Sequence, residues 1–205
     1  MTIADQPRPD APGPRNIRLV QLPALAIHAL ARGDLRAANR AAPLTLTRYF
    51  VYAADAVWRM RSAQIRTDPL AEAWITRVIW DVDAELAVGR AGFHGPPDAA
   101  GMVEIGYAVD PALRRRGYAR AAVAALLDRA AREPAVRTVR ASIRPDNLAS
   151  RALVLQFGFG EVGEQWDDED GLETLYEVEA GDLSSSGVTE PDPRSTDHSS
   201  SALST

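Results

Sequence analysis

The feature that most restricts the fold of this chain is a strand-like segment that runs into a basic turn and then into an amphipathic helix. Apolar residues alternate along residues 103–109, which predicts a half-buried strand. The turn that follows reads Arg114-Arg115-Arg116-Gly117-Tyr118-Ala119. From Ala119 to Ala130 apolar residues recur at i, i+3, i+4 and i+7, and Pro134 then stops the pattern, so a helix with one buried face is expected here.

A basic, glycine-bearing turn at a helix start is suited to holding phosphate. The first N–H groups of a helix have no partner within the helix and lie at the positive end of its dipole. Arginines at this end oppose the dipole, so Arg114, Arg115 and Arg116 make better sense with an anion present than as a solvated cluster. Gly117 would allow the backbone to approach that anion closely. The turn therefore predicts a nucleotide-like cofactor.

The composition of the chain argues against several classes of function. With 205 residues and 46% hydrophobic content, the chain is expected to form one domain with appendages. A net charge of -5 provides no global field that would attract nucleic acid or an acidic membrane. The absence of cysteine excludes disulfides, thiolate nucleophiles and Cys-containing zinc sites, and the three histidines show no ligand spacing, so no metal is expected.

The two ends of the chain differ from its middle. Residues 1–15 are rich in proline and lack an apolar h-region, and residues 181–205 are rich in Ser, Pro and Asp. Neither segment has enough apolar surface to fold, so both are expected to be disordered around a folded domain at residues 16–180. A cytoplasmic protein without a membrane anchor is expected.

The periodicities predict a mixed α/β domain that ends in an antiparallel hairpin. A first strand lies around 17–19, and Thr47 is a plausible N-cap for a long helix after an earlier one at 24–31. The expected elements beyond these are strands at 74–80, 86–93 and 139–143, a short helix from Leu148 capped by Asn147, and a final strand pair at 159–167 and 172–179.

Four segments together resemble the GNAT superfamily of N-acetyltransferases, and within it the RimJ/RimL type. They are Glu104-Ile105-Gly106-Tyr107-Ala108-Val109-Asp110-Pro111, Arg114-x-x-Gly117-x-Ala119, Pro145-Asp146-Asn147-x-x-Ser150 and Gly158-Phe159. The resemblance covers residues 85–160 well and the N-terminal 80 residues poorly. It implies a central, mostly antiparallel mixed sheet flanked by helices, with two splayed strands that form a cleft for acetyl-CoA.

The resemblance also implies the roles of single residues. The amides of Arg115, Arg116, Gly117, Tyr118 and Ala119 would hold the cofactor pyrophosphate, with Arg114 adding charge. Main chain of Tyr107, Ala108 and Val109 would pair with the pantetheine arm, and Asn147 and Ser150 would line the far side.

Glu104 is the candidate catalytic residue. It is the acid of an otherwise apolar strand, where a carboxylate must be solvated or paired. By the resemblance, it would take the proton of the amine, directly or through water; the competing interpretation is an outward-facing edge residue. Many superfamily members have a tyrosine that protonates the leaving thiolate seven residues after the position of Asn147, where this chain has Val154. His94, beside a turn, is interpreted as structural.

The function expected is therefore acetyl transfer from acetyl-CoA to a primary amine, which would be a small molecule or a protein N-terminus, in a monomer or homodimer. A non-catalytic acyl-CoA-binding or sensing module of the same fold is the alternative that Val154 keeps open. A nucleotide-binding protein of unrelated fold is disfavoured, because the chain has neither Gly-x-x-x-x-Gly-Lys-Ser/Thr nor Gly-x-Gly-x-x-Gly.

Overall fold

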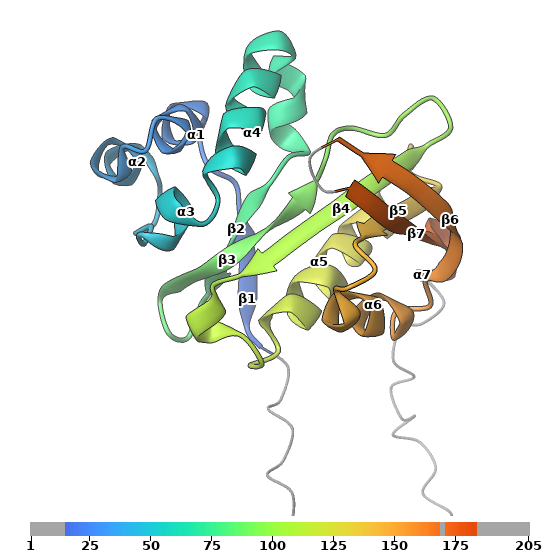
Figure 1. Cartoon of the computed structure of the whole chain (residues 1–205). Helices are drawn as coiled ribbons and strands as arrows, with labels where there is room; N and C mark the ends of the chain where they lie inside the picture. Colours follow the sequence, from blue (N-terminus) through green and yellow to red (C-terminus); the bar gives the residue numbers. More distant parts are fainter. Residues whose placement is uncertain (1–14, 169–170, 184–205) are drawn as a thin grey trace, which may run out of the picture.

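A seven-stranded sheet forms the centre of the molecule (Figure 1). The computed structural model describes residues 15–168 and 171–183. The strands are β1 (Ile17–Val20), β2 (Arg77–Asp81), β3 (Leu86–Phe93), β4 (Met102–Val109), β5 (Thr138–Ile143), β6 (Gly160–Asp167) and β7 (Gly171–Glu179). Their order is β1-β2-β3-β4-β5-β7-β6, and each neighbouring pair is antiparallel except β4 and β5. The predicted mostly antiparallel mixed sheet is confirmed.

Helices cover both faces of this sheet. They are α1 (Ala24–Ala31), α2 (Leu35–Ala41), α3 (Tyr49–Tyr52), α4 (Asp55–Thr67), α5 (Tyr118–Arg132), α6 (Leu148–Leu155) and α7 (Ala180–Leu183), with short 3-10 turns η1 (Pro69–Ala73) and η2 (Pro111–Leu113). Neighbouring residues of β2 point to opposite faces of the sheet. Val78 packs into the core formed with α1 to α4, and Ile79 packs into the core beneath α5. In the described part of the chain, no helix combines the length and the apolar character that crossing a bilayer requires.

The parallel strands β4 and β5 pair along only part of their length. Their register runs from Met102 opposite Thr138 to Glu104 opposite Arg140. Beyond Glu104, β4 continues beside β3, whereas β5 continues beside β7. The two strands therefore part in the middle of the sheet, as the resemblance implied.

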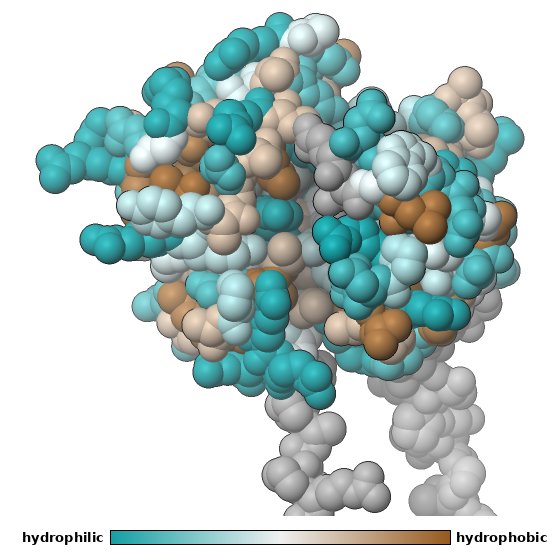
Figure 2. All heavy atoms as spheres, viewed as in Figure 1, coloured by the Kyte–Doolittle hydropathy of each residue, from teal (hydrophilic) through white to brown (hydrophobic). Residues whose placement is uncertain are grey.

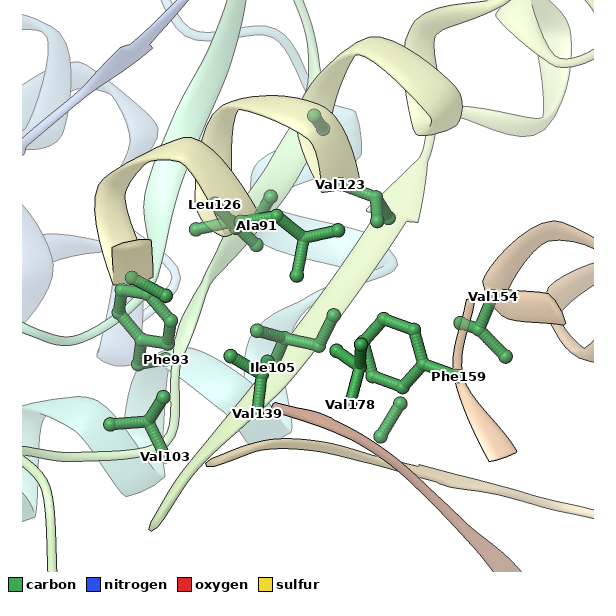
Figure 3. Packing of buried hydrophobic residues seen from close by; sticks show 14 of the residues in the cluster. Ala91, Phe93, Val103, Ile105, Val123, Leu126, Val139, Val154, Phe159 and Val178 are labelled. Atoms are coloured by element: carbon green, nitrogen blue, oxygen red, sulfur yellow. The ribbon is translucent and has the colours of Figure 1, made fainter. Parts of the chain in front are cut away.

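One core joins the two halves of the sheet across this split. Figure 3 shows Ile105 of β4, Leu126 of α5, Val139 of β5 and Phe159 in a common cluster, and these side chains are buried. Val154 of α6 belongs to the same cluster and has no exposed surface. The residue at the position where the resemblance implies a tyrosine in many superfamily members is therefore part of the core.

The strand predicted around 17–19, the helix predicted at 24–31 and the predicted elements from Leu86 onward agree with the structure to within a few residues. The segment between Ala31 and Leu86 differs. The helix expected from Thr47 is interrupted at Ala53–Ala54, and Thr47 is not its N-cap, because α3 begins at Tyr49 with Arg48 before it. The interruption brings the rings of Phe50 and Trp58 to 6.3 Å. In a continuous helix, residues at this separation would lie about 12 Å apart along the axis.

Two further corrections concern residues near this helix pair. Helix α2 was not predicted, and the segment from Trp74 to Thr76 precedes β2 rather than belonging to it. The segments predicted to be disordered fall mostly on residues 1–14 and 184–205, which lie outside the described residues.

Candidate functional site

A cleft of about 1000 Å³ lies between the end of β4, the start of α5 and helix α6. Ten of the eleven residues expected to bind cofactor line it: Tyr107, Ala108, Val109, Arg114, Arg115, Gly117, Tyr118, Ala119, Asn147 and Ser150. Arg116 is not among the lining residues, and its carbonyl accepts a hydrogen bond from Nε of Arg15 (2.7 Å). Segments far apart in the sequence thus form one concave surface.

The basic turn has a conformation that exposes the start of α5. Gly117 precedes the helix with φ of 86°, and Arg115 also has a positive φ of 62°. Gly117 supplies no capping side chain, so the first N–H groups of α5 receive no side-chain cap. The first residues of α5 line the cleft. Their unpaired amides and the positive helix end favour an anion at this position.

Two neighbouring segments hold this turn in place. The hydroxyl of Tyr118 donates to Oδ2 of Asp81 at the end of β2 (2.6 Å). The other carboxylate oxygen of Asp81 accepts from the main-chain N–H groups of Asp83 and Ala84. These bonds, led by the one from Tyr118, lower the pKa of Asp81, while burial raises the pKa of Tyr118. Arg15 completes the support by lying over the Tyr118 ring at 5.0 Å.

The main-chain N–H and C=O groups of successive β4 residues point alternately toward β3 and toward the cleft. The N–H of His94 donates to Glu104, and the N–H of Asp110 donates to Val88, so even-numbered residues of β4 direct their main chain toward β3. Tyr107 and Val109 direct theirs to the side from which β5 has diverged. A slender ligand in the split can therefore hydrogen-bond to this strand edge.

Helix α6 forms the far wall. Asn147 is its N-cap, as predicted, with its side chain accepting from the N–H of Ser150 (3.2 Å). The buried hydroxyl of Tyr107 lies near enough to Ser150 for that residue to lower its pKa, although burial raises the pKa more. It has no partner within hydrogen-bond geometry among the described residues. This buried hydroxyl is placed to receive or donate a hydrogen bond within the cleft.

Three polar residues of the cleft lie outside the sequence motifs: Arg120, Arg144 and Gln156. Arg144 pairs with Asp146 (2.8 Å), and Arg120 hydrogen-bonds to Gln156. Both arginines adjoin recognised motifs, one before the Pro145-Asp146-Asn147 cap and one in the first turn of α5. Their proximity in sequence to those motifs is the signal that could have identified them.

The opposite face of the β3–β4 pair carries the candidate catalytic acid. The carboxylate of Glu104 lies 3.4 Å from Nδ1 of His94, with 21% of its side chain exposed. His94 follows the end of β3 and was interpreted as structural, yet the strand register places it opposite Glu104. Figure 2 shows the surface hollowed between the N-terminal helices and the β6–β7 side, where β3 and β4 lie in Figure 1. The two faces of β4 thus present a cofactor-like cleft and a carboxylate–imidazole pair.

Helix α4 helps to hold the pair of His94 and Glu104 in place through Arg61. Arg61 is 5% exposed; its Nη1 donates to the carbonyl of His94 (2.9 Å) and its Nε donates to Oγ1 of Thr76 (3.1 Å). Burial lowers the pKa of Arg61 to about 10, so it remains charged near neutral pH. Burial also lowers the pKa of His94; Glu104 opposes this shift, and Arg61 and Arg90 add to it. On balance these effects favour the neutral imidazole.

Comparison with known proteins agrees with this arrangement. The family described as "Acetyltransferase (GNAT) domain" matches residues 25–160, which is more than half of the chain. An uncharacterized N-acetyltransferase of Bacillus subtilis, YjdG, is 39% identical over 88 residues. That alignment covers 43% of this chain and 51% of YjdG, so the chain matches about half the length of this curated relative.

Solved structures show the same fold at low sequence identity. The ribosomal L7/L12 acetyltransferase RimL, in complex with coenzyme A, is 18% identical with a TM-score of 0.57, covering 80% of this chain and 93% of that one. RimJ of Mycobacterium smegmatis, with a CoA disulfide, is 23% identical with a TM-score of 0.56, covering 83% and 90%. A chimera of the spermidine N-acetyltransferase SpeG of Vibrio cholerae is 13% identical with a TM-score of 0.58, covering 82% and 97%.

Proposed function

Because the chain belongs to the GNAT acetyltransferase family, we propose that it transfers an acetyl group from acetyl-CoA to a primary amine by direct attack. The observation that carries this proposal is the cleft in which β4 and β5 part and which ends at the basic turn before α5. We place the chain with the RimJ/RimL type, whose solved members share its fold. The acceptor would be a small-molecule amine or a protein N-terminus.

The chemistry of the cleft supports coenzyme A as its ligand. The amides from Arg115 to Ala119 would bind the pyrophosphate, because they combine unpaired N–H groups with a positive helix end. The free edge of β4 at Tyr107 and Val109 would pair with the amides of the pantetheine arm, and Asn147 and Ser150 would bound its other side. Bound in this way, acetyl-CoA supplies an activated acetyl group as a thioester. RimL and RimJ have been solved with coenzyme A or its disulfide, which supports this choice of ligand.

The residues of this chain would act mainly by positioning and by proton transfer. Direct attack of the amine in a ternary complex needs no covalent enzyme intermediate, and the chain has no cysteine to form one by thiolate attack. Main-chain N–H groups of β4 would polarise the thioester carbonyl, and Glu104, or a water that it holds, would remove the proton of the amine. With Val154 in the core, protonation of the leaving thiolate falls to water or to Ser150.

The test is thiol release from acetyl-CoA with four acceptor classes: an N-terminal peptide, an aminoglycoside, a polyamine and a small amino compound. Glu104→Gln should lower turnover roughly 10²-fold while the Kd for CoA stays nearly constant. Glu133→Gln, at the far end of α5, is the matched control and should behave as the wild type. Unchanged turnover in Glu104→Gln would show that Glu104 takes no part in the proton transfer.

The buried Val154 favours one second candidate, a non-catalytic acyl-CoA-binding or sensing module. The same assay separates the two functions. Tight CoA binding without thiol release from any amine would favour the sensor, and release with one acceptor class would favour the enzyme.

A further inference from the structure

The imidazole of His94 lies between Glu104 and Gly106 of β4. Nδ1 faces Oε1 of Glu104 at 3.4 Å. The other ring nitrogen lies over Gly106, since a Cβ at Gly106 would stand 2.8 Å from Nε2. Gly106 is two residues further along β4 than Glu104, in the direction of Ala108. The imidazole therefore extends along the strand from the carboxylate of Glu104 to Gly106.

The glycine is what permits this arrangement. Any side chain at Gly106 would collide with the ring and push it away from the strand. The main chain of His94 is also fixed from several sides, because its N–H donates to the carbonyl of Glu104 (2.8 Å) and its carbonyl accepts from Arg61 and from Nε2 of Gln64 (2.8 Å). These hydrogen bonds with α4 and β4 fix the main chain from which the imidazole projects.

The surroundings of His94 keep one of its nitrogens free for chemistry. The charged groups that face it are Glu104 from β4, Arg61 from α4 and Arg90 from β3. Burial and the two arginines favour the neutral ring, and the carboxylate favours the tautomer with a proton on Nδ1. Nε2 then carries a lone pair. Because 49% of the His94 side chain is exposed, an acceptor amine can reach the ring.

We propose that Nε2 of His94 is the atom that takes the proton from the amine, and that Glu104 acts through the imidazole by holding Nδ1. This inference rests on the proposed function and replaces the water between Glu104 and the amine with a protein side chain. Under it, His94 is the catalytic residue and Glu104 is a positioning residue that also stabilises the imidazolium.

The lone pair of the neutral amine forms the new C–N bond to the acetyl carbonyl carbon, and the C–S bond breaks with its electron pair going to sulfur. The surplus proton on nitrogen passes to Nε2 of His94, giving an imidazolium held by Glu104. The thiolate takes a proton from water, and the imidazolium returns its proton to solvent, so the products are the amide and the free thiol.

The test compares the pH profiles of wild type, His94→Gln and Glu104→Gln with the best acceptor amine. In the wild type, log kcat/KM should fall with slope one below the pKa of the amine and with slope two below the pKa of His94, which burial and the two arginines lower. His94→Gln should lose roughly 10²-fold in kcat, keep its Kd for CoA and keep slope one at low pH. Glu104→Gln should keep slope two, with its break moved to lower pH, because the carboxylate charge raises the pKa of His94.

If His94 had only a structural role, His94→Gln would leave the slopes of the pH profile unchanged. His28→Gln is the matched control, since His28 bonds to Ser62 rather than to the site (2.8 Å). NMR titration of the His94 ring in wild type and Glu104→Gln measures the same coupling without turnover. If His94→Gln retains wild-type kcat and slope two while Glu104→Gln loses activity, Glu104 acts directly and the inference fails. If the wild type acetylates no amine, the proposed function fails as well.

Discussion

At the scale of single residues, a buried hydrogen bond connects the core to the candidate pyrophosphate site. Tyr118 follows Gly117 directly and is 5% exposed, and Asp81 is 3% exposed. Their 2.6 Å bond fixes the first residue of α5 to the end of β2. Because Tyr118 also lines the cleft, the contact that stabilises the fold here also positions the main chain expected to bind phosphate.

We predict that Tyr118→Phe destabilises the protein in a pH-dependent way. A hydrogen bond to a charged group contributes about 1.5–3 kcal/mol, so the variant should lose a comparable free energy of unfolding at pH 7. The folded-state pKa of Asp81 lies below its ordinary value of 3.8. Its contribution is therefore complete above pH 3.8 and is lost as the pH falls through the folded-state value. Urea unfolding at pH 7 and in acid measures both effects.

The control for this prediction is Tyr176→Phe. Tyr176 is also buried, but its hydroxyl makes a longer bond of 3.3 Å to Glu161. The loss should be smaller than that of Tyr118→Phe. A difference between wild type and Tyr118→Phe that stayed constant from neutral pH into acid would show that the bond to the Asp81 carboxylate is not its source.

At the scale of elements, β4, the basic turn and α5 act as one unit. Residue Gly117 ends the turn in a left-handed conformation, and the helix starts at the next residue. Little but the side chain of Arg15, at 3.6 Å, lies near a Cβ at this position, so the restriction is on the backbone rather than on space. The direction in which the first amides of α5 point thus depends on this φ.

Gly117→Ala should lower stability and weaken CoA binding together. A non-glycine residue in the left-handed region costs about 1–2 kcal/mol, either as lost stability or as a shift of the turn. Gly33→Ala is the matched control, because Gly33 has a φ of 74° in the turn after α1 and lies outside the cleft. Thermal unfolding should show similar losses in both variants, and calorimetric titration with CoA should show weaker binding in Gly117→Ala alone. Equal CoA affinity in both variants would contradict the phosphate role of the turn.

The elements also show what the sequence could predict. The region from Leu86 to Phe159 has strong local periods and turn residues, so its strands and helices followed from the sequence, and ten of the eleven residues expected to bind cofactor line one cleft. The break between α3 and α4 could not, because it depends on Phe50 packing against Trp58. The position of His94 could not either, since it requires the β3–β4 register and a contact from α4.

At the scale of the whole molecule, the sheet consists of two antiparallel halves joined by a short parallel contact. Three residue pairs connect β4 to β5 before the strands part. The core beneath α5 supplies the remaining connection, with Ile105 and Val139 from the two halves in one cluster (Figure 3). A ligand in the split would contact both halves at once, so its binding should stabilise the molecule as a whole.

We therefore predict that CoA raises the melting temperature without any acceptor present. At a CoA concentration of about 100 times its Kd, binding to the folded state adds about 2.7 kcal/mol. For a domain of this size, that corresponds to an increase in Tm of about 5–10 °C. Hydrogen exchange should slow at the C-terminal half of β4 and in the first turn of α5, where the ligand would occupy main-chain N–H groups.

Pantetheine is the matched ligand for this experiment, because it contains the arm that would pair with β4 but lacks the pyrophosphate. If the amides of α5 and the arginine turn supply most of the affinity, pantetheine should raise Tm far less than CoA at the same concentration. Equal shifts would mean that the split between β4 and β5 is the main binding determinant and that the turn is secondary. The absence of a shift with CoA would contradict the cofactor assignment itself, since a ligand that binds the folded state and not the unfolded chain must raise the free energy of unfolding.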